Sequence, residues 1–203
     1  MDRRIGVIIA VVCCEVVFRL AYHSLPLSVD PLLYTLGVRF AETAVILSLA
    51  FPVCGIKAGS IRTELLIGIG ISAAFGAAVV SADLLSMLMI EGGILKILIA
   101  RQQVPDPLLF FVTGCVFAPF VEELFFRGLF YSWLRERLPV AISVFFSALA
   151  FASIHGFLSP VQITGGLLFA VIFEWRKNIW APYTVHAIAN TGIWILPWIY
   201  PFW

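Results

Sequence analysis

The chain has 203 residues, of which 62% are hydrophobic and 12% are charged, and its formal net charge is +1. A soluble protein is roughly 45–50% apolar and about 25% charged, so this composition excludes an ordinary soluble domain. The near-neutral charge leaves no basic surface, and no nucleic acid is expected as a partner. The four cysteines lie in or beside apolar runs without metal-binding spacing, so neither a disulfide framework nor a zinc finger is expected.

Long apolar stretches predict transmembrane helices, and strands are excluded because the stretches are long and do not alternate. The stretches cover residues 5–22, 32–54, 64–82, 107–130, 139–155, 160–175 and 179–199. An eighth stretch, 84–100, is interrupted by Glu91, Gly92, Gly93 and Lys96. Helices also satisfy every backbone polar group without water, as lipid requires. The predicted fold is an all-α polytopic transmembrane helical bundle of seven spans, or eight if 84–100 crosses, in a single integral-membrane domain over residues 1–203.

The basic residues favour seven spans with a cytoplasmic N-terminus, because lysine and arginine concentrate on cytoplasmic loops. If 84–100 lies along the interface, eight basic residues share the N-terminal side, and only Lys96 and Arg101 lie opposite. If 84–100 crosses, the split is five to four. The N-terminal apolar run resembles a signal peptide, but Glu15 and Arg19 stand where a cleavage site would be, so a retained first span is expected. In a prokaryote this location would be the plasma membrane.

Two pairs of opposite charges interrupt the first two spans. A charge at the membrane centre costs at least about 2.5–3.5 kcal/mol, so each one needs a reason. Glu15 with Arg19 and Arg39 with Glu42 have the i,i+4 and i,i+3 spacing of local ion pairs. We expect both pairs to support packing or topology.

A third charged group places Glu122, Glu123 and Arg127 in one apolar helix, expected over residues 107–134. Glu123 and Arg127 are four residues apart and can pair, whereas Glu122 points about 100° away around the helix. Two adjacent carboxylates in a low dielectric cannot both be ionised without help. We therefore expect one structural glutamate beside one that is available for proton transfer. Pro119 should disturb this helix three residues before Glu122.

Two histidines and an asparagine complete the set of polar side chains whose burial in the membrane costs free energy. His155 follows Phe151 by four residues at the end of an apolar stretch, and His186 and Asn190 are four residues apart in the last span. A single histidine in a membrane helix is most often a packing residue. Together with the two glutamates and the arginine above, however, these groups make six expensive side chains on three helices. One shared polar cavity explains all six, whereas independent packing roles would need six explanations.

In this order and spacing, the motifs resemble the CPBP intramembrane endopeptidases. These are the CAAX-protease and bacteriocin-processing proteins, also called the Abi family and related to the type II CAAX-prenyl endopeptidases. The motifs are Glu122-Glu123-x-x-x-Arg127, Phe151-x-x-x-His155 and His186-x-x-x-Asn190. The match runs from about Pro107 to Trp194, so the catalytic motifs are expected within 107–194. The first hundred residues carry no family signature, and better-known members of the family have eight spans.

The resemblance implies a protease in the lipid bilayer that hydrolyses a peptide bond of a membrane-associated protein or peptide. We expect it to need no cofactor. Glu122 with His155 would activate the attacking water, and His186 with Asn190 would stabilise the oxyanion. The other two members of the first motif would organise the site. These implied roles agree with elementary chemistry, because a carboxylate and an imidazole can deprotonate water. Fixed donors also hold a tetrahedral oxygen best where the dielectric is low.

Alternatives to this interpretation stay open. A zinc-dependent version of the protease would use Glu122, His155 and His186 as ligands with one open position. The chain has no HExxH motif, however, and Asn190 is a poor zinc ligand. A proton-coupled transporter would use the same groups as proton carriers, but such proteins usually show an internal repeat, and none is seen here. A catalytically silent immunity or scaffold protein would be expected to lose motif residues, and all six are present.

Overall fold

The computed structural model describes residues 3–24, 29–57, 61–98, 106–155 and 159–199, and these residues form helices and no strand. In chain order the first elements are α1 (Arg3–Ser24), α2 (Pro31–Ala50), the short 3₁₀-helix η1 (Phe51–Val53), α3 (Ile61–Ser86) and α4 (Gly93–Leu98). A continuous helix follows, made of α5 (Pro107–Phe110), η3 (Phe111–Phe117), α6 (Ala118–Glu123), η4 (Leu124–Tyr131) and α7 (Ser132–Arg135). The last elements are α8 (Val140–Ile154), α9 (Pro160–Arg176) and α10 (Trp180–Ile199).

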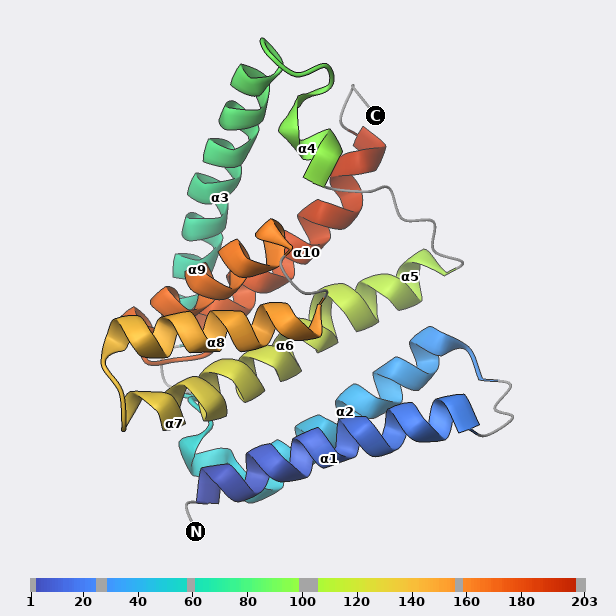
Figure 1. The fold of residues 1–203 in the computed structure, drawn as a ribbon, viewed down its shortest axis with the longest axis vertical. Coiled ribbons are helices and arrows are strands. Elements are labelled where there is room, and N and C mark those ends of the chain that lie inside the picture. The colour runs from blue at the N-terminus through green and yellow to red at the C-terminus, as the bar shows by residue number, and fades with distance from the viewer. Residues whose placement is uncertain (1–2, 25–28, 58–60, 99–105, 156–158, 200–203) are drawn as a thin grey trace.

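The helices are arranged in packed pairs around the continuous helix Pro107–Arg135 (Figure 1). α1 and α2 run side by side along one side of it, and α8 pairs with α9 on the other. α10 packs against α3, α9 and the middle of the continuous helix. This arrangement places the middle of the continuous helix at the centre of the molecule.

The helices lie where the apolar stretches predicted them, which confirms an all-α membrane bundle. Among the residues that the structure describes, four helices are long and apolar enough to cross a membrane, namely α1, α2, α3 and Pro107–Arg135. α8 is an apolar helix of 15 residues. At about 1.5 Å per residue it is shorter than a hydrocarbon core of about 30 Å. α9 and α10 are not among these four helices. The sequence of α10 includes the polar residues His186 and Asn190.

The interrupted stretch 84–100 does not form one crossing helix within the residues described. α3 ends before a turn in which Gly92 takes a positive φ of 80°, and the six-residue α4 begins at the next residue, Gly93. The carboxylate of Asp83 accepts a hydrogen bond from the backbone N–H of Leu95 at 2.7 Å, which holds α4 back against α3. Arg101, which entered the topology argument, lies outside the described residues.

Aspartate and proline set the beginnings of two helices. Asp30 accepts hydrogen bonds from the first free N–H groups of α2, with Pro31 as the first helical residue. Asp106 does the same for the continuous helix, with Pro107 in the equivalent place. A carboxylate cap satisfies donors that have no partner within the helix, and proline at the first position loses nothing because it has no N–H.

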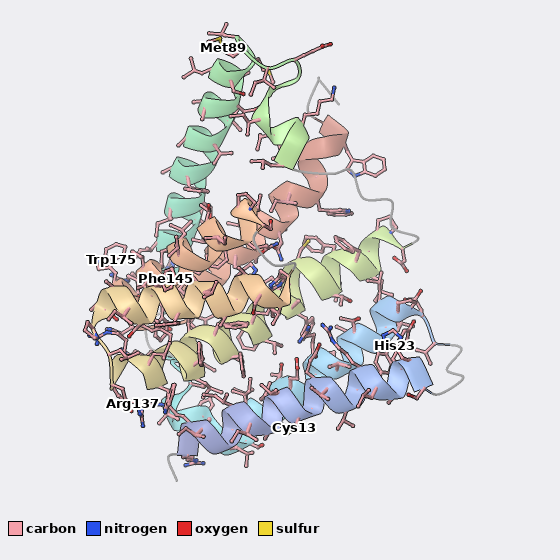
Figure 2. All side chains as sticks on the ribbon, viewed as in Figure 1. Cys13, His23, Met89, Arg137, Phe145 and Trp175 are labelled. Carbon is pink, nitrogen blue, oxygen red and sulfur yellow. The ribbon has the colours of Figure 1, made fainter. Side chains whose placement is uncertain are left out.

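Large apolar side chains point outward from the bundle. Met89 is 90% exposed, Trp175 65% and Phe145 57%, and Figure 2 shows all three at the outer surface. The charged residues of the motifs lie inside instead, since Glu123 and Arg127 are fully buried. An apolar exterior around a polar interior fits a protein whose surroundings are lipid.

The continuous helix approaches the turn after α2 very closely at Gly128. A Cβ atom at this position would lie 2.1 Å from the backbone oxygen of Cys54. The next residue of the turn, Gly55, accepts a hydrogen bond from the N–H of Ile179 at 3.1 Å, just before α10 begins. The turn therefore joins the continuous helix to the start of α10, and only glycine fits at the contact.

We expect Gly128→Ala to destabilise the protein by about 1–3 kcal/mol, because the new methyl group must displace backbone. Gly114→Ala is the matched control on the same helix, since its Cβ would lie 3.5 Å or more from its neighbours. Unfolding of the purified proteins in detergent, followed by tryptophan fluorescence, compares the two. Equal stability of both variants would show that the close approach is not a structural constraint.

Candidate active site

Glu122 and Glu123 lie on α6, between the π-helical stretches η3 and η4. Pro119 stands near the start of α6 and has no N–H to donate to the preceding turn. The disturbance expected from the proline therefore takes the form of π-helical turns within an unbroken helix (Figure 1). Such turns are frequent at functional sites.

Glu123 and Arg127 form a fully buried ion pair. Nη1 of Arg127 donates to Oε1 of Glu123 at 3.0 Å, and both side chains have no exposed surface. Nη2 of the same arginine donates to the backbone oxygen of Gly166 on α9 at 3.0 Å. The guanidinium also lies 4.8 Å from the ring centre of Phe151. Arg127 thus fixes the continuous helix against α8 and α9 as well as neutralising Glu123.

His186 shares the same glutamate oxygen. Its Nδ1 lies 2.9 Å from Oε1 of Glu123, and because an ionised carboxylate only accepts, Nδ1 donates. The imidazole stacks on Phe169 with ring centres 4.5 Å apart, and it is nearly fully buried. These contacts direct Nε2 toward Glu122, whose Oε2 is 3.6 Å away.

His155 approaches Glu122 from the end of α8. Its Nδ1 lies 2.9 Å from the backbone oxygen of Phe151, which can only accept, so Nδ1 carries a proton. In the neutral ring, Nε2 then keeps its lone pair, and this atom lies 3.4 Å from Oε2 of Glu122. The His155 side chain is 26% exposed, more than any other member of the cluster around Glu122.

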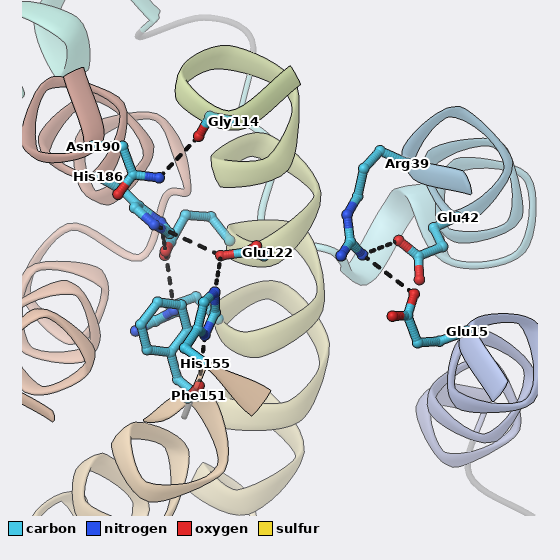
Figure 3. A network of polar contacts seen from close by, with 11 residues as sticks. Glu15, Arg39, Glu42, Gly114, Glu122, Phe151, His155, His186 and Asn190 are labelled. Carbon is cyan, nitrogen blue, oxygen red and sulfur yellow. Dashed lines mark hydrogen bonds and ion pairs between the residues drawn. The ribbon is translucent and has the colours of Figure 1, made fainter. Parts of the chain in front are cut away.

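Glu122 therefore presents one carboxylate oxygen to two imidazole nitrogens (Figure 3). The oxygen is buried and makes no hydrogen bond to any described residue. A carboxylate oxygen and the lone pair of His155 Nε2 are both acceptors, so a donor must lie between them: a shared proton or the O–H of a water molecule. The arrangement can therefore hold a water molecule and accept a proton from it.

Asn190 lies one turn beyond His186 on α10, next to this cluster but not in contact with Glu122. Its Nδ2 donates to the backbone oxygen of Gly114 at 2.9 Å. A side-chain amide carries two N–H donors, so a second remains for another acceptor. The structure thus brings five of the six candidate residues into direct contact, and it places the sixth beside them.

The two ion pairs expected in the first two spans are confirmed, and they are joined to each other. Nε of Arg19 lies 3.0 Å from Glu15, and Nη1 of Arg39 lies 2.6 Å from Glu42. Nη1 of Arg39 also lies 3.6 Å from Oε2 of Glu15, which links α2 to α1. This network lies across α6 from Glu122 (Figure 3) and supports the packing of the first two helices.

Some groups that hold the cluster carried no signal in the sequence. Phe169 supports His186 through ring stacking, but one phenylalanine among 18 has no distinguishing pattern. Gly166 supplies a backbone oxygen, which every residue has, so only the fold reveals its contact with Arg127.

The donor types around Glu122 suit a zinc ion, but their positions do not converge on one. Within the described ranges, no group of three or more His, Cys, Asp or Glu side chains is placed to hold a metal ion.

Fold and site together define an integral-membrane helical bundle with a buried glutamate and histidine cluster. The family "Type II CAAX prenyl endopeptidase Rce1-like" matches residues 104–192, a range that contains all six candidate residues. The chain belongs to this family of membrane proteases. α1, α2, α3 and α4 lie outside the matched range.

Two relatives come from Bacillus subtilis (strain 168). "Uncharacterized protein YpbD" is 30% identical over 143 residues, which are 66% of this chain and 70% of that protein. "Putative membrane peptidase YdiL" is 28% identical over 92 residues, which are 44% of this chain and 37% of that protein. No solved structure matches the chain.

We expect Arg127→Met to destabilise the protein by about 3–5 kcal/mol, because it leaves the Glu123 carboxylate buried without its cation. The double variant Glu123→Gln/Arg127→Met should recover much of this loss, since no unpaired charge remains. Arg19→Met is the matched control: Arg19 is 69% exposed, and an exposed pair contributes about 0–1 kcal/mol. Unfolding in detergent measures these three variants, the single variant Glu123→Gln and the wild type. Additive effects of the two single changes at 123 and 127 would contradict the coupling.

Proposed function

We propose that this protein is an intramembrane endopeptidase that hydrolyses a peptide bond of a membrane-associated protein or peptide with water activated by Glu122 and His155. The observation that carries the proposal is the position of Oε2 of Glu122, 3.4 Å from one imidazole and 3.6 Å from the other. Membership of a family of membrane proteases supports the same reaction.

In the first step, a water molecule between Glu122 and His155 attacks the carbonyl carbon of the substrate. The water proton passes to the carboxylate or the imidazole as the new C–O bond forms. A positioned general base of this kind contributes about 10²–10⁴-fold to the rate. The hydrogen bond from His155 to the Phe151 carbonyl keeps the Nε2 lone pair directed at the water.

The carbonyl oxygen gains negative charge in this step, and His186 and Asn190 are the donors available to it. His186 donates from Nε2 when its ring carries both protons, because Nδ1 is occupied by Glu123. Asn190 donates its second amide hydrogen. When the C–N bond breaks, the proton taken from water passes to the leaving amine. Glu123 and Arg127 do not touch the substrate in this scheme; they hold His186 in position.

The proposal includes a location and a topology. The chain would function as one integral-membrane domain, with the lipid bilayer as its surroundings and with its N-terminus in the cytoplasm. The basic residues of the N-terminal side support this orientation. The substrate would approach through the membrane, because the cluster is buried within the helical bundle.

We expect Glu122→Gln to lower cleavage by at least about 10²-fold, because the amide cannot accept the proton from water. Glu15→Gln is the matched control: the same change in a carboxylate of the α1–α2 network should leave cleavage within a few-fold. Mass spectrometry of peptide termini in the membrane proteins of cells expressing each form identifies the cleaved substrates. Identical termini from the wild type and the Glu122→Gln variant would end the protease assignment.

A chelator separates the proposed mechanism from a zinc-dependent one. We expect 1,10-phenanthroline to leave the cleavage rate of the purified wild-type enzyme unchanged, since no step uses a metal. Bound zinc in the same preparation is measured by mass spectrometry of the metal content. Loss of activity with the chelator, restored by stoichiometric zinc, would replace the water-activation scheme with a metal site on Glu122, His155 and His186.

A further inference from the structure

α3 and α10 pack against each other, most closely at Gly68, and then diverge. At Gly68 on α3, an added Cβ would lie 2.5 Å from Cβ of Thr184 and 2.9 Å from the backbone oxygen of Ala181. Two turns farther along the same face of α3, a Cβ at Gly76 would meet nothing within 4 Å. The two helices therefore meet at Gly68 and separate toward the C-terminal end of α10, as Figure 1 shows.

α4 and α9 enclose the space between the diverging helices. Asp83 accepts from the N–H of Leu95 at 2.7 Å, and the Ser86 hydroxyl accepts from the N–H of Ile94 at 3.0 Å. These bonds fix α4 against α3, so that Leu95 lines the space. The resulting cavity has a volume of about 360 Å³ and an almost entirely apolar lining from α3, α4, α9 and α10. Ligand sites in proteins span about 300–1,000 Å³.

This apolar groove is continuous with the candidate active site. His186 and Asn190 both line it, because residues four apart share one face of α10. Phe169, which stacks on His186, is also part of its wall. The groove thus begins at the two proposed oxyanion donors and extends along α10 toward its C-terminal end.

We propose that the groove binds large apolar side chains of the substrate, on one side of the peptide bond that is cleaved, and that Gly76 keeps it open for them. The proposal rests on the proposed function and names the substrate residues that the site selects. A peptide is the occupant because the polar end of the groove holds two donors for a carbonyl oxygen. The chain of a lipid would bring no amide group to them.

A substitution at Gly76 can test the groove, because a larger side chain there would not collide with the rest of the protein. Its Cβ direction is open, it lines the groove, and it lies on α3, outside the range matched by the family. Leucine at this position would fill part of the cavity and would also be a better helix former than glycine. Gly70 is the matched control, because it lies on the same helix with equally open space but does not line the groove.

The cleavage experiment uses the purified full chain in nanodiscs and fluorescence-quenched decapeptide libraries with one fixed position at a time. We expect the wild type to prefer Leu or Phe over Ala at one position beside the cleaved bond. Gly76→Leu should raise KM for the Leu and Phe peptides by about 10-fold or more, the size of effect that small volume changes in an apolar pocket produce. Cleavage of the Ala peptides by Gly76→Leu should change much less, because the alanine side chain does not reach into the part of the pocket that leucine fills. All cleavage by Gly70→Leu should stay within about two-fold of the wild type, since Gly70 does not line the groove. Equal KM values for all peptides in Gly76→Leu and the wild type would overturn the groove assignment.

A second measurement does not depend on hydrolysis. Decapeptides that carry a photoreactive leucine are crosslinked to the Glu122→Gln protein in nanodiscs, and the labelled residues are mapped by mass spectrometry. We expect residues of α3 and α4 that line the groove to be labelled, and we expect this labelling to be lost in the Glu122→Gln/Gly76→Leu protein. This result supports the groove even if the wild type cleaves no peptide. In that case only the proposed function fails. Labelling elsewhere, or no labelling because lipid occupies the groove, overturns the inference.

Discussion

A single carboxylate oxygen, Oε1 of Glu123, receives hydrogen bonds from both Arg127 and His186 in a region without exposed surface. A buried charge is costly unless it is paired, so these three groups must stay together once the helices pack. Arg127 extends the contact to the backbone of Gly166 on α9. The ion pair therefore locks α6, α9 and α10 in one relative position, and the geometry of the remaining site residues follows from that.

Helical geometry places the two glutamates in different surroundings. Adjacent residues point about 100° apart, so when Glu123 faces the arginine, Glu122 faces a different direction. That direction is the space between His155 and His186, with Oε2 at 3.4 Å and 3.6 Å from their Nε2 atoms. Arg127 donates its hydrogen bonds to Glu123 and to the backbone of Gly166, whereas Glu122 faces the two imidazoles. Glu123 is thus held in the ion pair that makes the site rigid, and Glu122 is the glutamate to which the proposed function assigns proton transfer.

Local spacing allowed much of this structure to be predicted, and tertiary contacts account for what was missed. The helix positions followed from apolar runs, and the Glu123–Arg127 and Arg39–Glu42 pairs followed from helical periodicity. The contact between His186 and Glu123 could not be predicted, because these residues are 63 positions apart and either glutamate was an equally good partner. The Arg39–Glu15 link between α1 and α2 was missed for the same reason. The described part of the stretch, residues 84–98, forms the end of α3, a turn and the short α4, because Asp83 accepts a hydrogen bond from Leu95 across a loop that has no repeating pattern.

The same helix, α10, connects the chemistry to the apolar groove. Gly68 of α3 contacts α10 at Thr184, two residues before His186, and beyond this contact the helices separate. His186 and Asn190 are about 6 Å apart along the axis of α10. A substrate side chain that binds between α3 and α10 would therefore begin within one helical turn of both residues. A carbonyl group near the mouth of the groove can then reach the two donors without any movement of α10. In the proposed mechanism, positioning of the substrate and stabilisation of the oxyanion both depend on the close approach at Gly68, a residue far from the catalytic motifs in sequence.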